Sequence, residues 1–147
     1  CVSTDRGLAR WRNAQWDLIG TSQGLESETL TALLQDREGS LWMASWGAGV
    51  ARWLGYGEWS SWTTADGLSN NLVWAIRRQP SGSVWVGTDR GLVELRDGVA
   101  VRVLTKKDGL GADKIKSLAT GPDGALWVAC SVTGRNSSPR SEQFFSD

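Results

Sequence analysis

The sequence predicts an all-β protein built from the blades of a β-propeller. Three observations predict this fold class: a repeat of about 42 residues, a composition rich in Trp and Gly, and turn sequences between short apolar runs. Ten Trp and 18 Gly occur among 147 residues, whereas Pro occurs only three times. Because aromatic residues favour strands and Gly favours tight turns, this composition is typical of many short strands.

Three landmarks recur in register along the chain. A Trp stands at positions 42, 85 and 127, a Gly-Leu pair ends at positions 25, 68 and 110, and a turn glycine stands at 39, 82 and 124. The spacings are 43 and 42 residues each time. Residues 1–8 match residues 85–92, with Cys1 in the place of the Trp. Three markers with one period indicate a single repeated structural unit.

Each unit divides into four short segments of strand character. In the third unit these are Val73–Arg78, Val84–Thr88, Leu92–Arg96 and Ala100–Leu104. None reaches the roughly 10 residues that a packed helix needs. The links carry type I turn chemistry, as in Gly121–Gly124, where Pro is second and Gly is last. Four antiparallel strands in about 42 residues form one propeller blade.

The segments also define the organisation of the chain. A partial blade is expected at 1–24, full blades at 25–67 and 68–109, and a partial blade at 110–130. Closed propellers have about four to eight blades, so we expect an incomplete ring that belongs with further blades of a longer protein. The pattern stops after residue 130, and residues 131–147 are expected to form a non-repeat tail that is disordered or artefactual.

Composition limits the possible functions. Sixteen Lys and Arg balance sixteen Asp and Glu, so the chain has no excess of positive charge for binding nucleic-acid phosphates. It has no His, the commonest general base and zinc ligand, and two Cys alone cannot form a zinc site. No apolar run approaches the length of a membrane span. We expect no nucleic-acid partner, no membrane insertion of this segment, no metal and no cofactor.

The units resemble the two-component regulator propeller repeat. The resemblance rests on Asp66–Ile76, Gly82–Thr88 and Gly91–Leu95, and it extends over residues 1 to about 130. It implies seven-bladed propellers in the extracytoplasmic part of bacterial receptors, ahead of a membrane span and an output module such as a histidine kinase or a diguanylate cyclase. It therefore implies a periplasmic sensor in a dimeric receptor, with a small-molecule or carbohydrate ligand and no catalysis in this segment.

Comparison of the copies separates a repeated frame from variable loops. The Trp at 42, 85 and 127 recurs at one position, so it is expected to fill the space between blades. The loop between two blades and the loop between the second and third strands of a blade lie at the same end, and both vary from copy to copy. Variable loops on a fixed frame are where a scaffold carries a binding site. The candidate ligand-binding residues on these loops are Trp46, Asn70, Asn71, Asp89, Arg90 and Asp113.

Other interpretations remain open. Asp and Asn are also turn formers, and Arg90 is also explained as a solvated charge. The Trp residues that are not repeated in every unit are better candidates for ligand contact than the repeated ones; they include Trp46, Trp59, Trp62 and Trp74. A polysaccharide-acting enzyme or a cytoplasmic interaction scaffold would use the same rim, although the absence of His and the single Tyr weaken the enzyme hypothesis.

Overall fold

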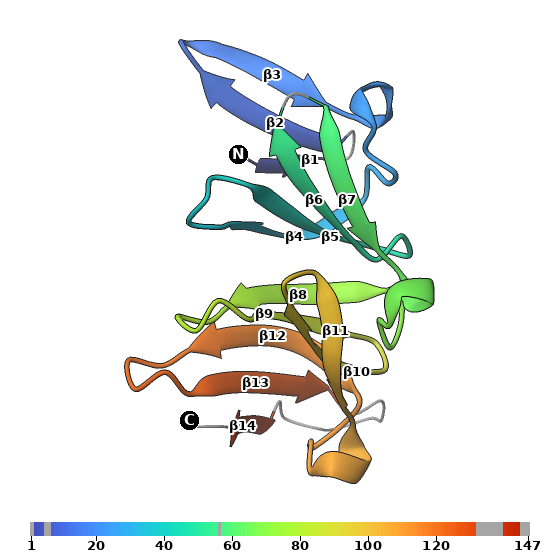
Figure 1. Cartoon of the computed structure of the whole chain (residues 1–147), viewed down its shortest axis with the longest axis vertical. Helices are drawn as coiled ribbons and strands as arrows, with labels where there is room; N and C mark the ends of the chain where they lie inside the picture. Colours follow the sequence, from blue (N-terminus) through green and yellow to red (C-terminus); the bar gives the residue numbers. More distant parts are fainter. Residues whose placement is uncertain (1, 5–6, 56, 132–139, 145–147) are drawn as a thin grey trace.

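The fold consists of antiparallel sheets stacked one after another along the chain. A computed structural model describes residues 2–4, 7–55, 57–131 and 140–144. These residues form fourteen strands in four separate sheets, joined by loops and short 3₁₀ turns (Figure 1). None of the helices in this part of the chain is long and apolar enough to cross a membrane. The predicted all-β class with propeller blades is confirmed, and the four sheets do not close a ring.

The two central sheets are complete four-stranded blades, each an up-and-down meander in chain order. Blade 2 contains β4 (Leu30–Gln35), β5 (Leu41–Ser45), β6 (Val50–Gly55) and β7 (Glu58–Trp62). Blade 3 contains β8 (Val73–Arg78), β9 (Val84–Thr88), β10 (Gly91–Arg96) and β11 (Val99–Leu104). The strands of blade 3 match the segments expected from the sequence to within one residue.

The outer two sheets have three described strands each. Sheet 1 contains β1 (Val2–Thr4), β2 (Gly7–Arg12) and β3 (Gln15–Ile19), and sheet 4 contains β12 (Lys114–Thr120), β13 (Leu126–Ser131) and β14 (Arg140–Phe144).

Residues 140–144, which the sequence analysis assigns to the non-repeat tail, have the backbone of a strand. These residues form β14, which pairs antiparallel with β13 from Cys130 to Leu126. The sequence of β14 is Arg-Ser-Glu-Gln-Phe, which lacks the apolar pattern of the third strand in the other copies. The strand still pairs, because the ladder is formed by backbone N–H and C=O groups and not by side chains. The rest of the tail expected to be disordered, residues 132–139 and 145–147, lies outside the described residues.

The first strands of successive blades lie side by side. Strand β8 contacts both β4 and β12, and the remaining strands of each sheet extend away from this line (Figure 1). Blades are joined through the Gly-Leu landmark, in which Gly67 adopts a φ of +100° at the end of a 3₁₀ turn. Leu68, which follows it, is buried in the core between blades 2 and 3. The landmark is therefore a structural joint between blades.

The cores lie between the sheets, and the repeated Trp residues fill them. Trp42 is 5 % exposed and stacks on Trp62, with 4.9 Å between the ring centroids, in a core completed by side chains of blade 3. Trp85 is 3 % exposed in the equivalent core between blade 3 and sheet 4. Trp127 is 39 % exposed, because no described blade covers its side of sheet 4. The expected core role therefore holds for two of the three copies.

The face of sheet 1 that points away from blade 2 is also exposed because no described blade covers it. Trp11 and Trp16 are both more than half exposed, although they stand at the repeat positions of Trp53 and Trp59 in blade 2. In blade 2 the pair is covered by sheet 1: the Arg10 guanidinium lies 5.3 Å from the Trp53 ring centroid, and Trp59 Nε1 donates to the Gln23 carbonyl at 2.8 Å. A blade face is thus buried only where a neighbouring blade lies against it.

This packing predicts unequal costs for two equivalent substitutions. We expect Trp85→Ala to lower the free energy of unfolding by about 3–5 kcal/mol, because it leaves a cavity between two blades. Trp127→Ala removes a side chain that lies on an uncovered face, so it should cost less than about half as much. Urea unfolding followed by circular dichroism measures both values. Equal losses would contradict the assignment of the blade interface as the source of stability.

Candidate functional site

The variable loops meet at one end of the blades, as the topology predicts. The amide N–H groups of Gly47 and Gly49, in the β5–β6 loop, both donate to the Asn71 carbonyl in the loop between blades 2 and 3, at 3.2 and 2.9 Å. The N–H of Asp89, in the β9–β10 loop, donates to the Leu72 carbonyl at 3.0 Å. Backbone hydrogen bonds therefore hold these loops together as one rim.

Each of the three first strands also carries a bulge at this rim. The pairing with the second strand skips one residue in β4, in β8 and in β12, and the skipped residues are Thr31, Trp74 and Lys116. Val73 and Ile115, which precede two of the bulges, are fully buried. A bulge redirects the extra side chain away from its strand neighbours, and bulges are frequent beside functional sites. The repeat thus presents one variable side chain per blade.

Trp74 is the centre of a side-chain cluster drawn from four segments. The Trp46 ring meets it edge-on, with 5.2 Å between the centroids and 66° between the planes. Trp74 Nε1 donates to Asp89 Oδ1 at 3.2 Å. The ammonium groups of Lys114 and Lys116, both on β12, lie 5.0 and 3.4 Å from the Trp74 ring centroid. We call Trp46, Trp74, Asp89, Lys114 and Lys116 the bulge cluster.

The charges of the bulge cluster do not cancel. Lys114 Nζ forms an ion pair with Asp89 Oδ1 at 3.0 Å. The hydrogen bond from Lys114 lowers the pKa of Asp89, and although burial opposes this, the Trp74 indole and the charges of both lysines reinforce it. Desolvation and the neighbouring Lys114 charge lower the pKa of Lys116, against a weaker opposite effect of Asp89. The cluster therefore holds one carboxylate and two amines, and among the described residues only Lys114 of the two amines has an ion-pair partner.

Two of the six predicted site residues, Trp46 and Asp89, belong to the bulge cluster. Arg90 is exposed beside it, and its N–H donates to the Thr88 hydroxyl at 3.0 Å.

The side chains of the other three predicted residues stabilise turns of the backbone. Asn70 Oδ1 accepts from the Leu72 N–H at 2.8 Å. Asn71 Oδ1 and Asp113 Oδ1 occupy equivalent positions, and each accepts from a backbone N–H at the start of the preceding 3₁₀ turn, at 2.7 and 2.6 Å. The turn-forming interpretation accounts for these contacts.

Sequence reasoning missed Lys114 and Lys116. A signal for this position existed in the sequence. The sixth residue after the landmark Leu differs in every copy, as Thr31, Trp74 and Lys116, whereas the residues on either side of it are always apolar or small. Of the non-repeated Trp residues proposed as ligand contacts, Trp62 is buried and donates through Nε1 to the Gly98 carbonyl at 2.6 Å, and Trp59 packs against sheet 1. Trp62 and Trp59 are therefore contacts between blades, and neither belongs to the bulge cluster.

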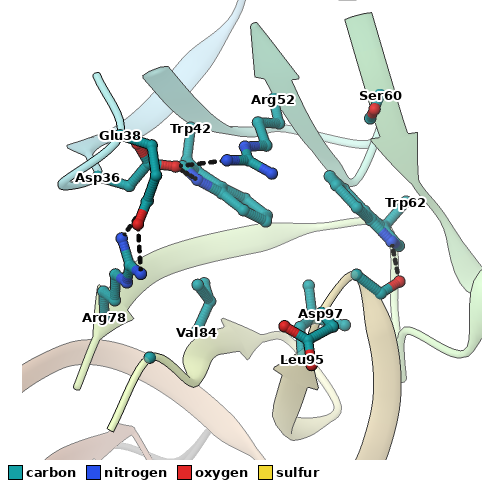
Figure 2. A pocket seen from close by; sticks show the side chains of 12 residues that line it. Asp36, Glu38, Trp42, Arg52, Ser60, Trp62, Arg78, Val84, Leu95 and Asp97 are labelled. Atoms are coloured by element: carbon teal, nitrogen blue, oxygen red, sulfur yellow. Dashed lines mark hydrogen bonds and ion pairs between the residues drawn. The ribbon is translucent and has the colours of Figure 1, made fainter. Parts of the chain in front are cut away.

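A second candidate, a cavity of about 380 Å³, lies at the other end of the blades between blade 2 and blade 3 (Figure 2). Its buried carboxylate, Asp36, accepts from Trp42 Nε1 and Arg52 Nη2, both at 2.9 Å, and from the Ser40 N–H at 2.8 Å. The Arg52 guanidinium lies over the Trp42 ring at 5.1 Å. Because these groups bind each other, we assign the cavity to the blade junction.

An ion pair across the same junction supports this assignment. Arg78 of blade 3 forms two hydrogen bonds with Glu38 of blade 2, at 2.6 and 3.2 Å, and Figure 2 shows this pair at the edge of the cavity. None of the six residues predicted for the ligand site lines this cavity.

The Asp36 network predicts sensitivity to acid. Burial would raise the pKa of Asp36, but the Trp42 and Ser40 hydrogen bonds and the Arg52 charge outweigh burial and hold the pKa below its ordinary value. A lowered folded-state pKa gives stability that is present above the unfolded-state pKa and is lost as the pH falls through the folded-state pKa. We therefore expect the free energy of unfolding to fall below about pH 4.

The variant Asp36→Asn tests the origin of this loss. It should lower stability at pH 7 by about 1–3 kcal/mol, because it leaves the Arg52 charge without its partner. It should also flatten the decline of stability below about pH 4. Urea melts at several pH values give both quantities, and an unchanged acid slope in Asp36→Asn would show that other carboxylates cause the decline.

Comparison with known proteins identifies a similar repeat in a known family. The model of the two-component regulator propeller family matches residues 24–47 and 67–90. Both segments run from the Gly-Leu landmark to the variable rim loop, and the second contains Trp74 and Asp89. No curated protein matches the sequence.

Solved structures share the fold. The extracellular domain of a proposed hybrid two component system from B. thetaiotaomicron superposes with a TM-score of 0.71 and 20 % identity, over 99 % of this chain and 23 % of that one. A structure of the same domain, described as a one component system, superposes with a TM-score of 0.69 and 16 % identity, over 88 % of this chain and 20 % of that one. A proposed gluconolactonase superposes with a TM-score of 0.59 and 18 % identity, over 88 % of this chain and 52 % of that one.

Identities of this size show similarity of fold alone. The chain spans about a fifth of the length of the B. thetaiotaomicron domains. The repeat period, the four-stranded sheets and the matched segments nevertheless agree with one another, and residues 24–47 and 67–90 are similar to the repeat of the two-component regulator propeller family.

Proposed function

We propose that this chain is part of the periplasmic sensor region of a bacterial signal-transduction receptor and that it binds a small-molecule or carbohydrate ligand at the bulge cluster. The repeat family and the extracellular domains of similar fold support the sensor role. The proposal includes further blades of the same propeller, a dimeric receptor and an output module elsewhere in the protein, with no catalysis in this segment.

The observation that carries the proposal is the bulge cluster itself. A repeated backbone feature, the bulge in each first strand, presents a different side chain in every copy, whereas the frame around it hardly changes. Trp46 is 54 % exposed although it is a large aromatic residue, and it lies directly beside Trp74. An exposed aromatic ring next to fixed polar groups suits a ligand that combines a flat face with hydrogen-bonding groups, as sugars do.

An enzymatic role has weaker support. The bulge cluster contains one carboxylate, Asp89, whose Oδ1 already binds Lys114 and Trp74, whereas glycoside hydrolysis commonly uses two carboxylates. In the part of the chain that the structure describes, no group of three or more His, Cys, Asp or Glu residues could hold a metal ion. The proposed gluconolactonase has a similar fold, but a fold does not determine an activity.

A signalling assay on the full receptor tests the proposal. Cells that carry the receptor gene and a reporter of its output are supplied with a panel of neutral and acidic oligosaccharides to find one that activates it. We expect Trp46→Ala to raise the half-maximal concentration of that activator by about tenfold or more, as loss of a central aromatic contact usually does.

The matched control is Val101→Ala, which alters a side chain of similar exposure on the outer strand β11. It should leave the response unchanged, and both variants should keep the melting temperature and circular dichroism of the parent protein. A Trp46→Ala receptor that folds and responds like the wild type would contradict the proposed site.

A further inference from the structure

We propose that the bulge cluster is an anion-binding subsite, in which Lys116 binds the carboxylate or sulfate group of an acidic sugar. This inference rests on the proposed function and narrows its ligand class. Three features of the cluster support it: the charge balance, the aromatic surface and the difference between the repeat copies.

The bulge cluster has one more positive than negative charge. Lys114 is neutralised by Asp89 at 3.0 Å, whereas Lys116 carries a second ammonium group over the same Trp74 ring, at 3.4 Å from its centroid. The nearby charged side chains offset each other: Arg90 next to Asp89 adds a positive charge, and Asp113, whose Oδ1 accepts from the Lys106 N–H, adds a negative one. Lys116 is itself exposed, so an anion from solution can reach it.

The electrostatic state of Lys116 favours an incoming anion. The cation–π contact holds the ammonium group in place, but desolvation and the Lys114 charge lower the pKa of Lys116. A bound carboxylate or sulfate would relieve the repulsion between the two ammonium groups, since a charge-assisted hydrogen bond to an anion stabilises the protonated amine. A neutral ligand would leave that repulsion in place.

The aromatic surface indicates what the anion is attached to. Trp46 stands edge-on to Trp74, with more than half of its surface exposed. A ring beside a cationic group suits a molecule with an apolar face and an acidic substituent. Uronic acids and sulfated sugars have both features, whereas a free inorganic anion would make no use of the Trp46 surface.

Comparison of the copies shows that the positive charge at the bulge position occurs on β12 and not on β4 or β8. The bulge residue of β4 is Thr31, whose hydroxyl donates to the Val73 carbonyl at 2.6 Å. The cationic bulge residue therefore occurs on β12 and lies against the aromatic one on β8. The three bulge positions carry three different side chains, of which Thr31 forms a hydrogen bond between blades and Lys116 lies over an aromatic ring.

Titration of the chain with matched sugars tests the inference. The indole N–H signals of Trp46 and Trp74 are followed by ¹⁵N NMR at constant ionic strength, with D-galacturonate and galactose 6-sulfate as acidic probes and D-galactose as the neutral one. We expect both acids to shift the two indole signals with a Kd at least about tenfold below that of galactose, a difference of about 1.4 kcal/mol. A response to one acid alone identifies that group as the preferred anion.

Lys116→Gln should abolish the difference between acids and galactose, and Lys107→Gln, an exposed lysine on the neighbouring 3₁₀ turn, should keep it. Equal shifts with galactose and the acids would overturn the anion subsite and leave a neutral sugar site. Absence of any shift, or acid binding retained in Lys116→Gln, would also overturn it. Since the signalling assay depends on Trp46 and not on ligand charge, it tests the proposed function separately.

Discussion

The structure depends on the packing of one blade against the next. A four-stranded sheet of this chain is apolar on both faces, so it is stable only where each face is covered. The close approach of the blades is visible at Gly87 of β9, where a Cβ would lie only 2.6 Å from Ile115 Cγ2 on β12. Trp42 and Trp85 then fill the wider part of the gap between sheets. Their repeat positions follow from this geometry.

The same constraint separates the framework from the site. Residues that face a neighbouring blade must fit a defined space, so they recur with the period of the repeat. The residue inserted at each bulge is not held to one kind of contact, since Thr31 bonds the Val73 carbonyl whereas Lys116 lies over the Trp74 ring, and it can differ from blade to blade. Trp74 and Lys116 come from neighbouring blades, which places them within reach of each other only when the two blades are packed. Ligand binding at this point would therefore be sensitive to how the blades sit together.

The repeated framework was predictable from the sequence, whereas what lies against each blade was not. The strands of blade 3 and the burial of Trp42 and Trp85 were predictable, because they repeat and depend on local alternation and on the neighbouring blade. The exposure of Trp127 was not predictable from its own copy, since burial depends on what lies against it.

The site was only partly predictable. Trp46 and Asp89 were found as variable loop residues, whereas Lys116 was missed because a bulge shifts the register by one residue and leaves no mark in the alternation pattern. Strand β14 was missed for a related reason, because its polar sequence gives no sign of backbone pairing.

The central claim is that the bulge residues belong to a site and not to the frame. The most direct measurement is the free energy of unfolding of the double variant Trp74→Thr/Lys116→Thr, in which both positions carry the residue found at Thr31 in blade 2. If the claim holds, this variant loses less than half as much stability as Trp85→Ala and keeps the strand content of the parent. A loss as large as that of Trp85→Ala would show that the bulge cluster holds the blades together, and the claim would be wrong.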